Sequence, residues 1–159
     1  MFEARITELG LTIPTVPAPL AAYVPAVRTG DYVYTSGQLP FLNGELIATG
    51  LVHSEVDIDT AVLCARQSAL NALAAVKTVI HSLDEVERIV KVVGFVASAH
   101  DFSQHPMIVN GASQLLGEIF GDAGKHARSA VGVSSLPMNA PVELEMVVAL
   151  KVKNSTSTV

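Results

Sequence analysis

Two stretches of the chain, residues 86–98 and 142–152, are predicted β-strands with apolar residues at both parities. A strand with one face in water alternates apolar and polar residues, whereas a strand covered on both sides does not. Only two long helices are predicted, over residues 57–83 and 101–120, and two helices cover one face of a sheet but not two. The second face therefore needs another partner, and the simplest one is the same sheet in a sister subunit. Only 16% of the residues are charged, which also indicates more burial than a small domain achieves alone.

The helices are predicted from spacing and end signals. In residues 57–83, apolar residues recur on one helical face, and four alanines in that stripe allow a close approach to a sheet. Asp57 suits the positive amino-terminal end of this helix. A short helix is predicted over residues 2–9. Asp101 is expected to cap the second long helix, with Pro106 in its first turn.

Turn signals predict the remaining strands. Thr29-Gly30-Asp31 separates strand candidates at 23–28 and 31–38, and Asn43-Gly44 is a strong two-residue turn signal. A second hairpin is predicted from residues 129–133 and 142–152. The element order indicates an α+β fold, in which one mixed β-sheet carries two main helices on one face. Residues 1–153 are expected to form a single domain, followed by a polar tail at 154–159.

The charged and sulfur-containing residues narrow the possible partners. The formal net charge is −5 without a Lys/Arg cluster, so no nucleic-acid partner is expected. No apolar run approaches the roughly 18 residues of a membrane span, so no membrane partner is expected either. A single cysteine, Cys64, fits a reducing compartment, and residues 1–10 lack the apolar core of a signal peptide, which predicts a cytoplasmic location. The five histidines lack metal-site spacing, so no metal is predicted.

Charged residues within the carboxyl-terminal strands are the first candidates for a functional site. Arg128 begins a strand of small residues, while Glu143 and Glu145 interrupt an apolar strand and share one of its faces. Burying a charge is costly unless it is paired or used. The arginine and a glutamate at opposite ends of a hairpin could meet in one pocket. The alternative is a structural ion pair beside one solvated glutamate, and the pattern alone leaves both open. Gly37, inside a predicted strand, marks either a bulge or a close approach to the backbone.

Several sequence blocks follow one another in a specific order. They are Thr35-Ser36-Gly37-Gln38-Leu39-Pro40, Asp101-Phe102 with Asn110 downstream, Ala127-Arg128-Ser129-Ala130-Val131, and Leu136-Pro137 followed by Val142-Glu143-Leu144-Glu145. Over nearly the whole chain this arrangement resembles the Rid (YjgF-like) reactive intermediate deaminase family, which older labels call the L-PSP endoribonuclease family. The resemblance is closest to the longer branch with an N-terminal helix.

The resemblance implies both a fold and an activity. The fold is chorismate-mutase-like, and three sheets form a central barrel in a homotrimer with clefts between subunits. The activity is hydrolysis of 2-imino acids, or of enamines such as 2-aminoacrylate, to 2-keto acids and ammonia. No cofactor is expected, because the imine is already electrophilic and water is the other reactant.

The resemblance also assigns roles to individual residues. Arg128 corresponds to the arginine that binds the substrate carboxylate, for which a planar guanidinium offers two parallel hydrogen bonds. Glu143 corresponds to the glutamate that positions or deprotonates the attacking water, although Glu145 shares its strand face and could exchange roles with it. Tyr23 corresponds to a tyrosine of the cleft, and Gly37 to a backbone element that lines it.

Ala130 stands where many members of the family carry a cysteine. Its backbone could still bind substrate, but a thiol role is lost, and Asn110 is expected to be structural. This departure keeps a second hypothesis open, that of a non-catalytic trimeric protein that binds small carboxylate metabolites. A ribonuclease fits poorly, because the chain is acidic and has no histidine pair or metal constellation for phosphodiester cleavage.

Overall fold

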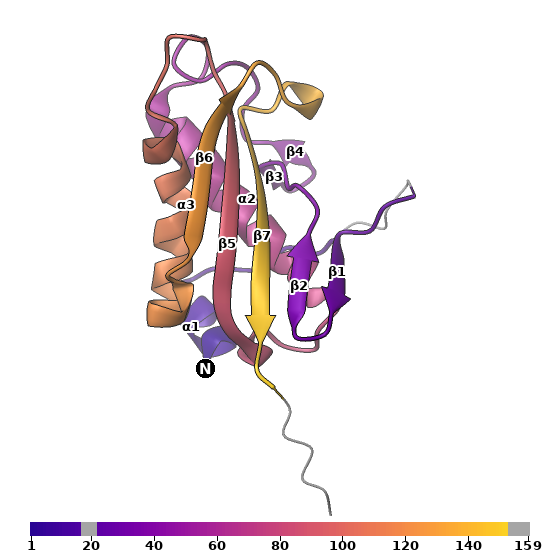
Figure 1. Cartoon of the computed structure of the whole chain (residues 1–159). Helices are drawn as coiled ribbons and strands as arrows, with labels where there is room; N and C mark the ends of the chain where they lie inside the picture. The colour runs from indigo at the N-terminus through magenta and orange to yellow at the C-terminus, as the bar shows by residue number, and fades with distance from the viewer. Residues whose placement is uncertain (17–21, 153–159) are drawn as a thin grey trace, which may run out of the picture.

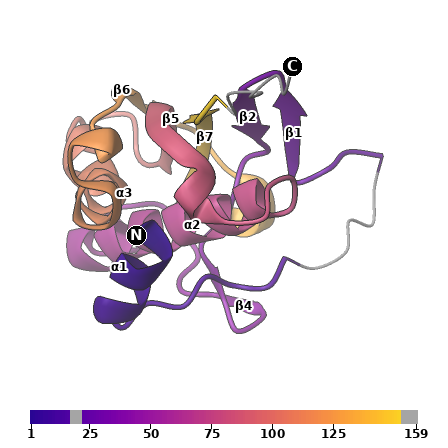
Figure 2. The same ribbon diagram turned by 90° about the horizontal axis from the view of Figure 1, so that it is seen from below.

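The centre of the computed structural model is a five-stranded mixed sheet in the order β1-β2-β7-β5-β6 (Figure 1). The structure describes residues 1–16 and 22–152, so the predicted tail at 154–159 lies outside it. The helices and strands, in chain order, are α1 (Phe2–Glu8), β1 (Ala26–Thr29), β2 (Tyr32–Thr35), β3 (Phe41–Leu42), β4 (Glu45–Leu46), α2 (Ile58–Lys77), the 3₁₀ turn η1 (Leu83–Glu85), β5 (Val86–Ala97), α3 (His105–Phe120), η2 (Gly121–Gly124), β6 (Ala127–Val133), η3 (Pro137–Asn139) and β7 (Val142–Leu150). Figure 2 shows α2 and α3 on one side of the sheet. The predicted α+β class and the placement of both helices on one face are therefore confirmed.

β6 and β7 do not form the predicted hairpin. β5 lies between them, parallel to β6 and antiparallel to β7. The chain passes from β5 through α3 to β6, and a helical crossover of this kind makes the two strands parallel. The connection that contains Pro137 and Pro141 then carries the chain past β5, so β6 is left as an edge strand. The prediction was wrong because strands that are neighbours in sequence need not pair in the sheet.

Both predicted tight turns are confirmed. β1 and β2 pair as an antiparallel hairpin, with Gly30 at φ +57° in the turn. β3 and β4 pair around Asn43 and Gly44, whose φ values of 51° and 86° suit the residue types that favour left-handed turns. The strands are shorter than predicted, and Tyr23 precedes β1 instead of lying within it.

The observed helix ends confirm one of the two predicted N-cap residues. Asp57 accepts a hydrogen bond from Thr60 N at 2.8 Å and begins α2, as predicted. α2 ends at Lys77, earlier than the predicted residue 83, and Ser82 caps the separate turn η1. Asp101 does not cap α3, since residues 99–102 form a turn of their own and Gln104 is the N-cap residue. Pro106 does lie in the first turn of α3.

The two faces of the sheet differ in burial. Alternate residues of β7 that point toward the helices are fully buried, whereas their neighbours on the opposite face are only half-buried. On that opposite face, Tyr32 and Tyr34 of β2 are 47% and 48% exposed. We call this side of the sheet the open face. Burial on both sides was predicted for residues 86–98 and 142–152. Within a single chain, the burial on the helix side is confirmed and that on the open face is not observed.

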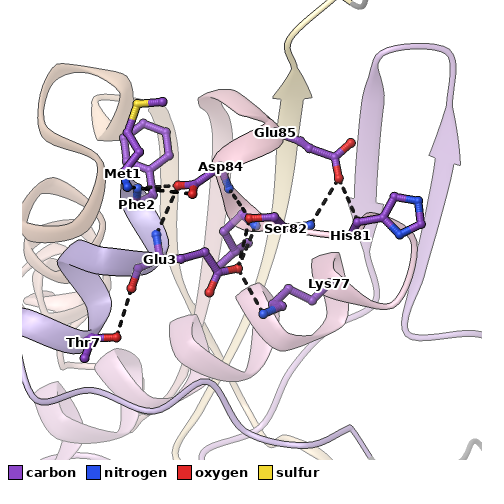
Figure 3. A network of polar contacts seen from close by, with 10 residues as sticks. Met1, Phe2, Glu3, Thr7, Lys77, His81, Ser82, Asp84 and Glu85 are labelled. Atoms are coloured by element: carbon purple, nitrogen blue, oxygen red, sulfur yellow. Dashed lines mark hydrogen bonds and ion pairs between the residues drawn. The ribbon is translucent and has the colours of Figure 1, made fainter.

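α1 is anchored by reciprocal helix capping (Figure 3). Asp84 Oδ1 accepts hydrogen bonds from the backbone N–H groups of Phe2 and Glu3. In return, Glu3 Oε1 accepts from Leu83 N at 2.9 Å and pairs with Lys77 Nζ at 3.0 Å. Each helix therefore supplies the carboxylate that satisfies the free N–H groups of the other. This contact holds α1 against the segment that leads into β5.

Gly111 allows α2 and α3 to pack closely. A Cβ atom at this position would lie 2.2 Å from the backbone oxygen of Val62, which cannot rotate away. Gly111→Ala is therefore expected to lower the free energy of unfolding by about 1–3 kcal/mol in urea denaturation. Gly117, also on α3, has no heavy atom within 4 Å of such a Cβ. Gly117→Ala is expected to raise the free energy of unfolding by about 0.5–1 kcal/mol, and equal effects of the two substitutions would contradict this packing argument.

Candidate functional site

Arg128 lies on the edge strand β6 and faces α3. Its Nη1 atom donates to Asn110 Oδ1 at 2.8 Å and to Ser113 Oγ at 3.1 Å. Both partners belong to α3, one helical turn apart, so they reach the same side chain. Asn110, which was expected to be structural, therefore directly holds Arg128, the residue predicted to bind the substrate carboxylate.

His126, which the sequence pattern did not single out as a site residue, extends this cluster. Ser113 Oγ lies 2.9 Å from His126 Nε2, and His126 Nδ1 lies 2.6 Å from the carbonyl oxygen of Gly124. Burial lowers the pKa of His126, the nearby charge of Arg128 lowers it further, and the hydrogen bond to Gly124 opposes both effects. The available signal was that residues two apart in an extended segment point the same way, which places His126 beside Arg128.

Glu143 lies on the open face, with its carboxylate packed against Gly37. A Cβ atom at Gly37 would lie 1.9 Å from Glu143 Oε1, so any side chain at this position would displace the Glu143 carboxylate. Paired backbone hydrogen bonds between Gln38 and Leu144, of 2.8 Å and 3.0 Å, hold the two segments together. Burial raises the pKa of Glu143, and the neighbouring charge of Glu145 raises it further. The close approach predicted at Gly37 is confirmed, and its neighbour is the predicted catalytic glutamate.

Tyr23 lies at the same end of β2 as Gly37. Its ring is 66% exposed and precedes β1. Ser36 Oγ donates to the carbonyl oxygen of Val24 at 2.6 Å, and Ser36 N donates to that of Pro25 at 2.8 Å. These bonds hold the segment that follows Tyr23 beside the segment that contains Gly37.

Arg128 and Glu143 do not meet within one chain. Arg128 pairs with Val92, which is buried beneath the helices, whereas Glu143 pairs with Phe95 on the open face. β5 separates the two strands, which puts them about 10 Å apart across the sheet as well as on opposite faces. The single pocket predicted from a hairpin is therefore wrong for one chain. Within the described residues neither side chain forms an ion pair, so the alternative of a structural ion pair is not observed there either.

The two remaining candidates fall on different faces. Ala130 shares the helix-side face with Arg128 and packs against the core. Glu145 faces the open side and lines a hollow of about 210 Å³ together with Tyr34 and Lys91. Lys91 Nζ donates to Ser129 Oγ at 3.1 Å and has no bond to Glu145. Glu145 is thus placed apart from the Gly37 contact that Glu143 makes.

Residues 1–16 and 22–152 were also compared with the requirements of metal sites, reactive thiols and membrane-spanning helices. No group of three or more His, Cys, Asp or Glu side chains is arranged there to hold a metal ion. Burial raises the pKa of the Cys64 thiol to about 11, which leaves it protonated and a poor nucleophile at neutral pH. No helix in the described part of the chain is long and apolar enough to cross a membrane.

Comparison with known proteins places the chain in a family. The family model described as "YjgF/chorismate_mutase-like, putative endoribonuclease" matches residues 3–150. Protein TCP17 of Trypanosoma cruzi is 36% identical over 148 residues, covering 92% of each chain. A protein of Dermatophagoides farinae named 2-iminobutanoate/2-iminopropanoate deaminase is 32% identical over 142 residues, covering 89% of this chain and 95% of its own. The crystal structure of Atu1372 from Agrobacterium tumefaciens, described as of unknown function, is 42% identical with a TM-score of 0.87, covering 94% of this chain and 93% of that one. The chain therefore belongs to the YjgF family and has its chorismate-mutase-like fold.

Proposed function

We propose that this protein hydrolyses reactive 2-imino acids, or their enamine tautomers, to 2-keto acids and ammonia. The observation that carries the proposal is the guanidinium of Arg128, which two neutral side chains orient while no carboxylate in the described residues neutralises it. A fixed, uncompensated guanidinium suits a small carboxylate ligand. A family relative named as a 2-imino acid deaminase supports the same substrate class.

The proposed reaction uses Glu143 as the general base. Water attacks the imine carbon while Glu143 accepts one of its protons and returns it to the substrate nitrogen, which gives a tetrahedral carbinolamine. The hydroxyl of the carbinolamine then gives up its proton, by way of Glu143, to the nitrogen, so that the C–N bond breaks, the carbonyl forms and ammonia leaves. Burial and the charge of Glu145 raise the pKa of Glu143, which makes its carboxylate a stronger proton acceptor. Arg128 holds the substrate carboxylate, and Tyr23, Gly37 and Ala130 are proposed to line the same cleft. Imine and water are the only reactants, so no cofactor takes part in the proposed reaction.

This cleft is proposed to form between subunits of a homotrimer. Arg128 and Glu143 lie on opposite faces of one sheet, so one chain cannot supply both to the same ligand. We place the edge strand β6 of one subunit beside Glu143 of the partner subunit. Three sheets that close into a barrel would also cover Tyr32 and Tyr34 of the open face. Static light scattering is expected to give three times the chain mass of 16.7 kDa, and a monomer would contradict the shared cleft.

The activity can be tested directly. An amino-acid oxidase generates a 2-imino acid in solution, and the purified protein is expected to increase the rate of 2-keto acid release. The reaction is proposed to occur in the cytoplasm, with neither nucleic acid nor membrane as a partner.

A second candidate, a trimer that binds small carboxylates without turnover, is favoured by Ala130, which removes the family's thiol. Calorimetry with 2-ketobutyrate beside the kinetic assay separates the two. Binding without any acceleration would favour the second candidate.

A further inference from the structure

The hydrogen bonds around Arg128 occupy one nitrogen completely. A guanidinium has five N–H groups, two of them on Nη1. Those two are donated to Asn110 Oδ1 at 2.8 Å and to Ser113 Oγ at 3.1 Å. In the described part of the chain, neither Nε nor Nη2 of Arg128 donates to an acceptor. The Nε–Nη2 edge therefore keeps the parallel pair of N–H groups that matches a carboxylate.

The direction of each bond in the cluster follows from its chemistry. The carbonyl oxygen of Gly124 can only accept, so His126 Nδ1, 2.6 Å away, carries the hydrogen. In a neutral imidazole Nε2 is then an acceptor, and the Ser113 hydroxyl donates its single hydrogen to it. Ser113 Oγ is left to accept from Arg128. Arg128 therefore donates to Ser113, Ser113 donates to His126, and His126 donates to the carbonyl oxygen of Gly124.

We infer that Ser113 and His126 are positioning residues, which hold Nη1 of Arg128 so that its Nε–Nη2 edge receives the substrate carboxylate. This inference rests on the proposed function for the identity of the ligand, and goes beyond it by assigning the binding edge and two residues that determine it. His126 touches no ligand in this arrangement and acts only through Ser113.

Protonation of His126 breaks the order of these bonds. Nε2 then becomes a donor, and Ser113 Oγ must accept from an imidazolium and a guanidinium at once, with its own hydrogen turned away. Burial and the charge of Arg128 already lower the pKa of His126. The positioning is therefore present above the ordinary histidine pKa of 6.5 and is lost as the pH falls through the lower value of the folded protein.

The charged groups on the neighbouring elements have partners of their own. Arg88 of β5 donates to the Lys125 carbonyl oxygen, and Lys125 pairs with Asp122 at 2.7 Å. Glu118 of α3 pairs with Arg66 at 2.7 Å. The charge of Arg128 lowers the pKa of His126, so an imidazolium at position 126 would repel this guanidinium.

The inference is tested by calorimetric titration of the full-length protein with 2-ketobutyrate, between about pH 5 and about pH 8. The affinity of the wild type is expected to fall at acid pH. His126→Ala and Ser113→Ala are expected to bind about tenfold more weakly at neutral pH, since each leaves one hydrogen bond of a charged network unmade. His126→Gln places a carbonyl oxygen near the position of Nε2 and cannot titrate, so it should recover most of the affinity lost in His126→Ala and lose the acid dependence. His100→Gln, at an exposed position, is the matched control and should follow the wild-type curve.

A wild-type affinity that rises toward acid pH would overturn the inference, because it would show plain attraction between the ligand and an imidazolium. So would a His126→Gln variant that keeps the wild-type acid dependence. Imidazole ¹⁵N NMR tests the direction of these hydrogen bonds without any ligand. The neutral ring of His126 is expected as the Nδ1–H tautomer, with a pKa that rises in Ser113→Ala, and the Nε2–H tautomer would overturn the inference. If NMR shows the expected tautomer but the protein binds no 2-keto acid, the proposed function is rejected, and so is the assigned binding edge of Arg128. The directions of the hydrogen bonds would then still be established.

Discussion

Arg128→Ala is expected to reduce kcat/KM for 2-imino acid hydrolysis about a thousandfold, because it removes the proposed bidentate charged contact to the substrate carboxylate. Binding of 2-ketobutyrate should be lost in parallel. The measurement is 2-keto acid release from an imine generated by an amino-acid oxidase, with calorimetry beside it. Asn110 and Ser113 would be left facing solvent or each other, so a folded variant is expected.

Arg128→Lys is expected to restore little of this activity. An ammonium is a point charge that cannot accommodate Asn110, Ser113 and both ligand oxygens in one plane. Arg28→Ala is the matched control, since Arg28 is exposed on β1 and its Nε donates only to the Gly30 carbonyl oxygen among the described contacts. Unchanged turnover in Arg128→Ala, with circular dichroism equal to the wild type, would reject the assignment of the deaminase site.

Glu143→Gln is expected to lower kcat by about 10²–10⁴-fold with little change in KM, because an amide cannot accept the proton of the attacking water. The wild-type activity should fall with decreasing pH through the pKa of Glu143, which burial and Glu145 place above the usual 4.5. Activity falls on the acid side because only the ionised carboxylate of Glu143 accepts a proton. A raised pKa of Glu143 moves this acid limb of the pH–activity profile to higher pH. Glu145→Gln removes one of the two causes, so the acid limb should shift to lower pH. A loss of kcat in Glu145→Gln as deep as in Glu143→Gln would instead assign the water to Glu145.

The same two variants test whether the cleft is shared between subunits. Arg128→Ala and Glu143→Gln should each be inactive alone. If each site takes Arg128 from one subunit and Glu143 from the next, co-refolding equal amounts should restore about a quarter of the wild-type activity, since each hybrid trimer regains one intact site. No recovery, in a mixture shown to contain hybrid trimers, would contradict the shared cleft.

Sequence patterns that span only a few residues predicted much of the fold. The 3.6-residue spacing and Asp57 predicted α2, and Gly30 and Asn43-Gly44 predicted two tight turns. These predictions succeeded because capping, turn geometry and helical periodicity depend on residues a few positions apart. The cap at Asp101 failed where a competing turn over residues 99–102 used the same backbone.

The candidate site divides in the same way. The residue types of the site were predictable, since an arginine among small residues and a glutamate in an apolar strand stand out without a structure. Three features required the folded chain. β5 separates Arg128 from Glu143, the two residues lie on opposite faces of the sheet, and Ser113 and His126 hold the guanidinium. Strand pairing and helix docking bring together residues that are far apart in sequence, and the spacing of residues along the chain does not encode which strand will lie between two others.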